Sequence, residues 1–129
     1  MLSIDDLLGV RFKSHGRSIE EGFDCYGLAI EVSRRLGHKL DDLWYEKSCP
    51  ETFAEKSAGV LEKLSDRIKE TDKLELGNLV VFFDGNGNMV HIGVILNEDR
   101  FIHSDSGGVK VMNIHTYYRK DRKVYEWLQ

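Results

Sequence analysis

Three side chains in this sequence have the types that a thiol-based nucleophilic site needs: Cys25, His91 and His103. Cys25 lies in "EEGFDCYGLAIEVSRRLG", where a glycine-containing loop gives way to a helix with periodic apolar residues. A thiol in the first turn of a helix lies beside unpaired backbone N–H groups and the positive end of the helix dipole, and both favour the thiolate. The sequence therefore predicts a lowered pKa and a nucleophilic role for Cys25.

The two histidines lie on either side of one predicted hairpin, in "MVHIGVIL" and "RFIHSDSGG". If residues 97–99 form a three-residue loop, Asp105 lies opposite His91, and His103 is its diagonal neighbour on the same face, about 7–8 Å away. An even-numbered loop would place the two rings on opposite faces. In the three-residue case, His91 can take the thiol proton while His103 or Asp105 orients its ring. The alternative is a buried structural thiol with strand histidines that serve as hydrogen-bonded core residues.

Helices are predicted in the first half of the chain. A short one follows Ser3 and ends at Gly9, and a longer one is capped by Asp24 and ends at Gly37. A third is expected to begin at Pro50. Its apolar face would consist of Phe53, Val60, Leu61, Leu64 and Ile68.

Short β-rich segments replace this pattern after Lys73. They are "NLVVFF", "MVHIGVIL", "RFIHS" and "VKVMNI", and a last strand is expected at 124–127. The connections are short enough to require antiparallel hairpins. The sequence thus predicts a single α+β domain over residues 1–129, with N-terminal helices packed on a C-terminal antiparallel sheet.

Composition excludes several classes of function. The two cysteines of the 129-residue chain lack metal-site spacing, and "DGNGN" has Met89 and Ile95 where a calcium loop needs Gly and Glu, so we expect neither a metal nor another cofactor. The net charge of −4 argues against nucleic acid as a partner. No apolar run is long enough for a membrane span, and the acidic N-terminus is unlike a signal peptide, which predicts synthesis in the cytoplasm.

Three sequence blocks resemble the NlpC family of cell-wall cysteine peptidases. "GFDCYGLAIEVSRRLG" is similar to the family's "DCSGLV" block, "LELGNLVVFF" to its "PGDLVFF" strand, and "HIGVIL…RFIHS" to its "HVGIYLG…FIHA" segment. The resemblance implies a papain-like α+β fold with Cys25 as nucleophile, His91 as general base and His103 as the orienting third residue. It also implies cleavage of peptidoglycan stem peptides between D-γ-glutamyl and diaminopimelyl or lysyl residues.

The resemblance also indicates residues that would bind substrate. Asp24 matches an acid that is placed to meet a substrate amine, and Tyr26 stands where the family commonly has Ser. In the preceding loop, His15 is expected to line the cleft and Arg17 to hold a substrate carboxylate. Phe12 falls where many members have a Tyr whose hydroxyl can help to stabilise an oxyanion, which would lower the rate.

The short chain looks most like members associated with phage tails and prophages. That similarity implies phage-tail proteins as partners, and either a place in the virion or delivery to the cell wall. Two alternatives stay open: another papain-like reaction of the same triad, such as deamidation or acyl transfer, and a non-catalytic tail module that binds peptides.

Overall fold

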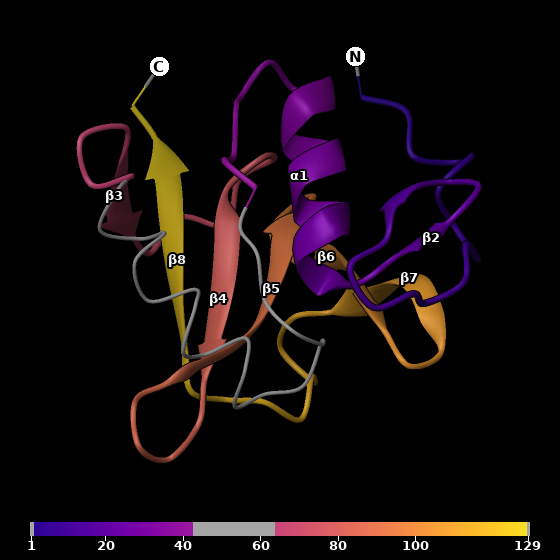
Figure 1. The fold of residues 1–129 in the computed structure, drawn as a ribbon. Coiled ribbons are helices and arrows are strands. Elements are labelled where there is room, and N and C mark those ends of the chain that lie inside the picture. The colour runs from indigo at the N-terminus through magenta and orange to yellow at the C-terminus, as the bar shows by residue number, and fades with distance from the viewer. Residues whose placement is uncertain (1, 43–63, 129) are drawn as a thin grey trace.

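The structure, a computed structural model, describes residues 2–42 and 64–128. In this part of the chain, one α-helix packs against a six-stranded antiparallel sheet, and a two-stranded ribbon precedes the helix (Figure 1). The elements are β1 (Arg17–Ser18), β2 (Gly22–Phe23), α1 (Cys25–Arg35), β3 (Ile68–Thr71), β4 (Leu79–Phe83), β5 (Met89–Ile95), β6 (Arg100–Asp105), β7 (Gly108–Asn113) and β8 (Arg122–Trp127).

The sheet has the strand order β3-β8-β4-β5-β6-β7. Strands β4 to β7 follow one another as antiparallel hairpins, so the predicted meander is confirmed. The C-terminal strand β8 does not extend the meander at β7. It pairs with β4 on one side and with β3 on the other, and therefore occupies an interior place in the sheet (Figure 1).

Helix α1 forms where the sequence predicts it. The Asp24 side chain caps it by accepting a hydrogen bond from the Gly27 N–H at 2.8 Å, and Gly37 follows its end with a φ of 86°. Leu28, Ala29 and Val32 form its buried face and pack with residues of β5 and β6. The cap and the apolar face together fix Cys25 as the first helical residue.

The sheet separates two groups of buried side chains. Alternate residues of β4 and β5, among them Leu79, Ile92 and Val94, face α1 and form the larger cluster. The intervening residues project from the other face, where Phe82 and Phe101 belong to a smaller cluster. His91 and His103 follow the second pattern, because their rings contact Phe82 and Phe101 respectively.

Two helix predictions differ from the structure. Residues 5–9 form hydrogen-bonded turns in which the Leu7 and Leu8 N–H groups both bond to the Ile4 carbonyl, because Gly9 ends the segment before a helix can propagate. Ile68 is the first residue of β3, where pairing with Trp127 overrides its place in the predicted helical pattern. The rest of that predicted helix, from Pro50 to residue 63, lies outside the described residues, as does Cys49.

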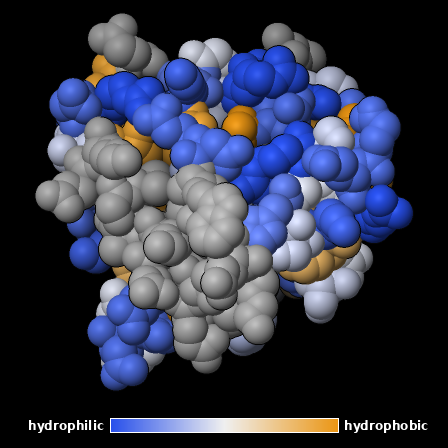
Figure 2. All heavy atoms as spheres, in the orientation of Figure 1, coloured by the Kyte–Doolittle hydropathy of each residue, from blue (hydrophilic) through white to orange (hydrophobic). Residues whose placement is uncertain are grey.

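Hydrophilic side chains cover most of the coloured surface in the view of Figure 2, and hydrophobic residues show as small patches between them. Among the described residues, no helix has the length and apolar character needed to cross a membrane. Within residues 2–42 and 64–128, no group of three or more His, Cys, Asp or Glu side chains is arranged to hold a metal ion.

Candidate active site

The structure brings His91 and His103 into direct contact. The pairs Val94–Ile102 and Ile95–Phe101 set the register of β5 and β6, as the predicted three-residue loop requires. The two imidazoles therefore share a face, and His91 Nε2 lies 2.7 Å from His103 Nδ1 with the rings nearly perpendicular, at 81°. The predicted hairpin parity is confirmed, and His103 is the residue that contacts the far nitrogen of His91.

Aromatic side chains enclose this imidazole pair. Phe101 lies against the His103 ring with centroids 4.7 Å apart, and Phe82 lies 5.7 Å from the His91 ring. Tyr117, from the loop before β8, contacts both imidazoles. The ring is buried, but no sequence signal indicates that it packs on the histidines, because an irregular loop brings it there.

This environment keeps the imidazoles neutral. Burial lowers the pKa of His91, and the neighbouring His103 ring and the Arg119 guanidinium lower it further. Burial also lowers the pKa of His103, against the opposing effect of the Asp105 carboxylate. At neutral pH each ring therefore carries a proton on only one nitrogen, and a single proton lies between Nε2 of His91 and Nδ1 of His103.

The thiol of Cys25 reaches the sheet where β5 and β6 separate. The two strands pair at Val94 and Ile95, and Ile92 lies before the paired part of β5. The Ile95 N–H bonds to Asn78 on the β4 side, so by strand alternation the Ile92 N–H points toward β6. That N–H lies close enough to Cys25 Sγ to lower the pKa of the thiol. The start of α1 thus places the sulfur beside the backbone of the residue that follows His91.

The expected lowering of the Cys25 pKa is wrong for this state of the site. Burial is the largest influence and, with the negative charge of Asp24, raises the pKa of the thiol to about 12. Cys25 as a whole is only half-buried, yet the densely packed atoms around the sulfur outweigh the favourable N–H groups of Tyr26 and Ile92. The resting site therefore consists of a neutral thiol and neutral imidazoles.

Proton transfer from Cys25 to His91 remains a prediction. Among the described residues, no hydrogen bond joins the Cys25 sulfur to either histidine. Because His91 Nε2 is engaged by His103, its Nδ1 is the nitrogen left to accept the thiol proton. The imidazoles project from the sheet face that carries Phe82 and Phe101, opposite the face on which α1 packs, so the mechanism requires the His91 ring or Cys25 to move into reach of the other.

The loop before α1 is held by the carboxylate of Asp24, which is 1% exposed. Its Oδ2 accepts the His15 N–H at 2.9 Å, and His15 has a φ of 64°, a conformation that non-glycine residues seldom adopt. Its Oδ1 accepts Arg17 Nη1 at 2.9 Å. The loop also lies tightly on the helix, because a Cβ on Gly27 would be 2.1 Å from the Gly16 carbonyl oxygen. These contacts give Asp24 a structural role in addition to any role in binding substrate.

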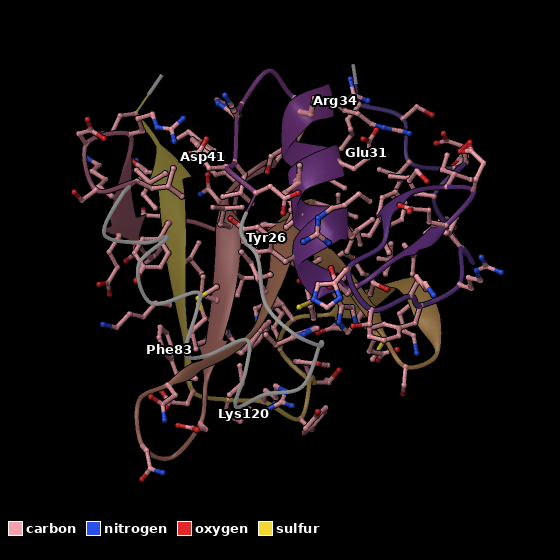
Figure 3. All side chains as sticks on the ribbon, in the orientation of Figure 1. Tyr26, Glu31, Arg34, Asp41, Phe83 and Lys120 are labelled. Atoms are coloured by element: carbon pink, nitrogen blue, oxygen red, sulfur yellow. The ribbon has the colours of Figure 1, made fainter. Side chains whose placement is uncertain are left out.

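Two other predicted substrate-binding residues are also engaged by the chain itself. Arg17 donates from Nε and Nη2 to the Asp42 carboxylate, in addition to its bond to Asp24. The Tyr26 ring is buried and its hydroxyl donates to the Asp41 carbonyl (Figure 3). The bulk of Tyr26 thus serves the core and the connection after α1. A carboxylate clamp at Arg17 would have to compete with Asp24 and Asp42.

We expect Arg17→Ala to lower the free energy of unfolding by about 1–3 kcal/mol, because it removes the guanidinium that binds the buried Asp24 carboxylate at 2.9 Å. The matched control is Arg34→Ala, which removes an exposed ion pair with Glu31 on α1 (Figure 3) and should cost about 0–0.5 kcal/mol. Urea unfolding of both variants measures the difference. Equal costs would contradict the structural role of Arg17.

The comparisons with known proteins agree with this fold. Residues 9–127 match the profile of the NlpC/P60 family. The crystal structure of the NlpC/p60 domain of the peptidoglycan hydrolase SagA superposes with a TM-score of 0.61 at 18% identity, covering 92% of this chain and 89% of that one. A protein described as similar to lipoprotein, NLP/P60 family, from Staphylococcus aureus subsp. aureus Mu50 gives a TM-score of 0.58 at 20% identity, covering 93% of this chain and 39% of that one. No curated protein matches the sequence. The family match spans nearly the whole chain, and the protein belongs to the NlpC/P60 family.

Proposed function

We propose that this protein is a cysteine endopeptidase that hydrolyses peptidoglycan stem peptides between D-γ-glutamyl and diaminopimelyl or lysyl residues. The observation that carries the proposal is the 2.7 Å contact between His91 and His103, which lie on strands that pack against the helix beginning at Cys25. Family membership and the peptidoglycan hydrolase among its structural neighbours support the substrate class.

The proposed reaction has two stages. His91 Nδ1 takes the Cys25 proton as the sulfur attacks the carbonyl carbon of the scissile bond. Collapse of the tetrahedral intermediate breaks the C–N bond, and the imidazolium returns its proton to the leaving amine. Water, deprotonated by His91, then hydrolyses the thioester and restores the thiol. His103 orients His91 throughout without itself exchanging a proton with the substrate.

Because the thiol pKa is raised at rest, the proposal assigns thiolate formation to the substrate-bound site. Free backbone N–H groups at the start of α1, including that of Cys25, would hold the oxyanion. A substrate amine that approaches Asp24 Oδ1 would compete with Arg17 Nη1, which lies 2.9 Å from that oxygen. The backbone N–H of His15 binds the other oxygen of Asp24, so the loop that carries His15 would border the same part of the site.

Phe12 offers a direct test of oxyanion stabilisation. A β-bridge joins Phe12 to Phe23, which lies two residues before Cys25. Phe12 therefore belongs to a segment that pairs with the chain just before the nucleophile. Phe12→Tyr adds a hydroxyl donor there, and we expect turnover of stem peptides to rise by about tenfold or more, because an oxyanion donor is typically worth a hundredfold or more. Steady-state kcat measures the effect, with Phe83→Tyr, which lies at the end of β4, as a control that should leave kcat unchanged. A lower or equal kcat in Phe12→Tyr would contradict this placement of the oxyanion.

The experiment that tests the function is incubation of purified protein with defined stem peptides, followed by mass spectrometry of the products. We expect fragments cut between D-glutamyl and diaminopimelyl or lysyl residues. Release of ammonia, or transfer to an added amine without chain cleavage, would instead identify deamidation or acyl transfer by the same thiol.

Two observations favour a second candidate, a non-catalytic module that binds peptides, such as a phage-tail component. The raised thiol pKa and the lack of a hydrogen bond between Cys25 and His91 in the described residues fit a site that has lost rate. The incubation with stem peptides distinguishes the two candidates: cleavage that Cys25→Ala abolishes supports the peptidase. Peptides that bind but stay intact would favour the binding module.

A further inference from the structure

The Nε2 atom of His103 is an unpaired polar atom in the interior. His103 is 0% exposed, and its Nε2 has no hydrogen-bond partner among the residues that the structure describes. The other ring nitrogen, Nδ1, is bound to His91. A buried polar group without a partner costs free energy, so whether this nitrogen carries a proton depends on the charged groups around it.

Two proton arrangements are consistent with the contact between the histidines. In the first, His91 Nε2–H donates to His103 Nδ1, so His103 carries its proton on Nε2 and His91 Nδ1 has a free lone pair. In the second, His103 Nδ1–H donates to His91 Nε2, so His91 carries its proton on Nδ1. Only the first leaves His91 able to accept the proton of Cys25. The state of His103 Nε2 therefore decides whether His91 can act as a base.

Asp105 is the carboxylate nearest to this nitrogen in the strand pattern. It follows His103 by two residues in β6, so both side chains project from the same face. Lys110, the cross-strand partner of His103 in β7, binds Asp105 Oδ1 at 3.0 Å, and the Gly107 N–H binds the same oxygen at 2.8 Å. Among the described residues Oδ2 accepts no further hydrogen bond. The carboxylate is thus fixed beside His103 by one of its oxygens.

Three charged side chains act on the imidazole pair: Asp105 from β6, Lys110 from β7 and Arg119 from the loop before β8. Asp105 raises the pKa of His103 and Lys110 lowers it, with Asp105 the stronger of the two. Arg119, from the loop before β8, acts on the His91 side of the pair. Asp105 also raises the pKa of His91. Because His103 Nδ1 is occupied by His91, Nε2 is the His103 nitrogen on which the charge of Asp105 can favour a proton.

We propose that Asp105 is a positioning residue that holds a proton on His103 Nε2 and thereby leaves His91 Nδ1 unprotonated toward Cys25. The carboxylate acts through its charge and through Oδ2, directly or by one buried water. Only the catalytic consequence rests on the proposed peptidase function, because the tautomers are properties of the folded protein. The site would then be a chain of four residues: Cys25, His91, His103 and Asp105.

The test reads the tautomers by two-bond ¹H–¹⁵N correlation spectra of protein with ¹⁵N-labelled histidine at pH 7.5. We assign the signals by their loss in His91→Gln and His103→Gln. In the wild type both rings should carry the proton on Nε2. In Asp105→Asn the proton of each ring should move to Nδ1, while Asp99→Asn, in the β5–β6 turn, should leave both unchanged. A wild-type His103 protonated on Nδ1, or unchanged tautomers in Asp105→Asn, would overturn the proposal.

If Asp105→Asn fails to fold, Lys110→Met serves instead. This substitution removes the cation that opposes Asp105. Both rings should keep their Nε2 protons, and the pKa of His103 should be higher than in the wild type. An unchanged or lower pKa of His103 overturns the proposal. With active protein, Asp105→Asn should reduce kcat on the order of tenfold with little change in KM. Because the spectra need no substrate, wild-type tautomers as proposed in a protein without peptidase activity would refute the function and leave this inference standing.

Discussion

Replacing Cys25 by alanine is expected to reduce cleavage of stem peptides by on the order of a thousandfold or more, and His91→Ala should reduce it about as much. The thiol and the imidazole perform one step together, so the double variant should be no slower than either single variant. Product formation from a defined peptide, followed over hours, measures the three losses. Near-wild-type cleavage by either single variant would refute the assigned nucleophile or base.

Two further variants serve as controls for this prediction. Cys49→Ala should cut at the wild-type rate, because no base is assigned to that thiol. His103→Ala should retain some turnover, since the residue orients His91, with which it makes the 2.7 Å contact, and does not itself transfer the substrate proton. Circular dichroism and urea unfolding should show that every variant is folded. Complete loss of activity in His103→Ala would assign it more than an orienting role.

Acid should destabilise the protein through its two buried imidazoles. Burial lowers the pKa of His91 to about 3 and that of His103 to about 4, whereas an unfolded histidine titrates near pH 6.5. Between those values the unfolded state binds more protons than the native state, so the free energy of unfolding falls as the pH drops below about 6.5. At pH 5 we expect a loss of about 2 kcal/mol for each imidazole relative to pH 7.5.

Urea unfolding at pH 7.5 and pH 5 tests this second prediction by comparison of variants. His91→Gln and His103→Gln should each lose less stability on acidification than the wild type does, and the double variant should lose least. The difference between proteins isolates the histidines, because the carboxylates are common to all of them. The same loss in the wild type and the double variant would mean that the native imidazoles are protonated with the unfolded ones.

The contact between His91 and His103 could be predicted from the sequence because strand parity depends on local chemistry. A three-residue loop at residues 97–99 was one of two possibilities, and the structure has the register that it requires, so alternation places both rings on one face. The start of α1 was equally local, since Asp24 combines a capping side chain with a following apolar face. Both features depend only on interactions between residues that are close in sequence or that face each other across one hairpin.

The rest of the site depends on long-range packing, which a single sequence does not reveal. The helix start favours a Cys25 thiolate, but burial of the sulfur and the negative charge of Asp24 reverse the effect. The roles of Arg17 and Tyr26 likewise depend on contacts with Asp42 and Asp41, after the helix. Strand β3 was missed because its pattern is short, and only pairing with β8 makes it a strand.

The interior place of β8 has a consequence for the order in which the protein can fold during synthesis. Residues 122–127 leave the ribosome after every other described strand, yet they fill the position between β3 and β4. Until then, β4 presents an unpaired edge and β3 has no partner in the sheet. The nascent chain can therefore close the hairpins around His91 and His103 early, but it must keep the β4 edge from pairing with other chains until translation has passed Trp127.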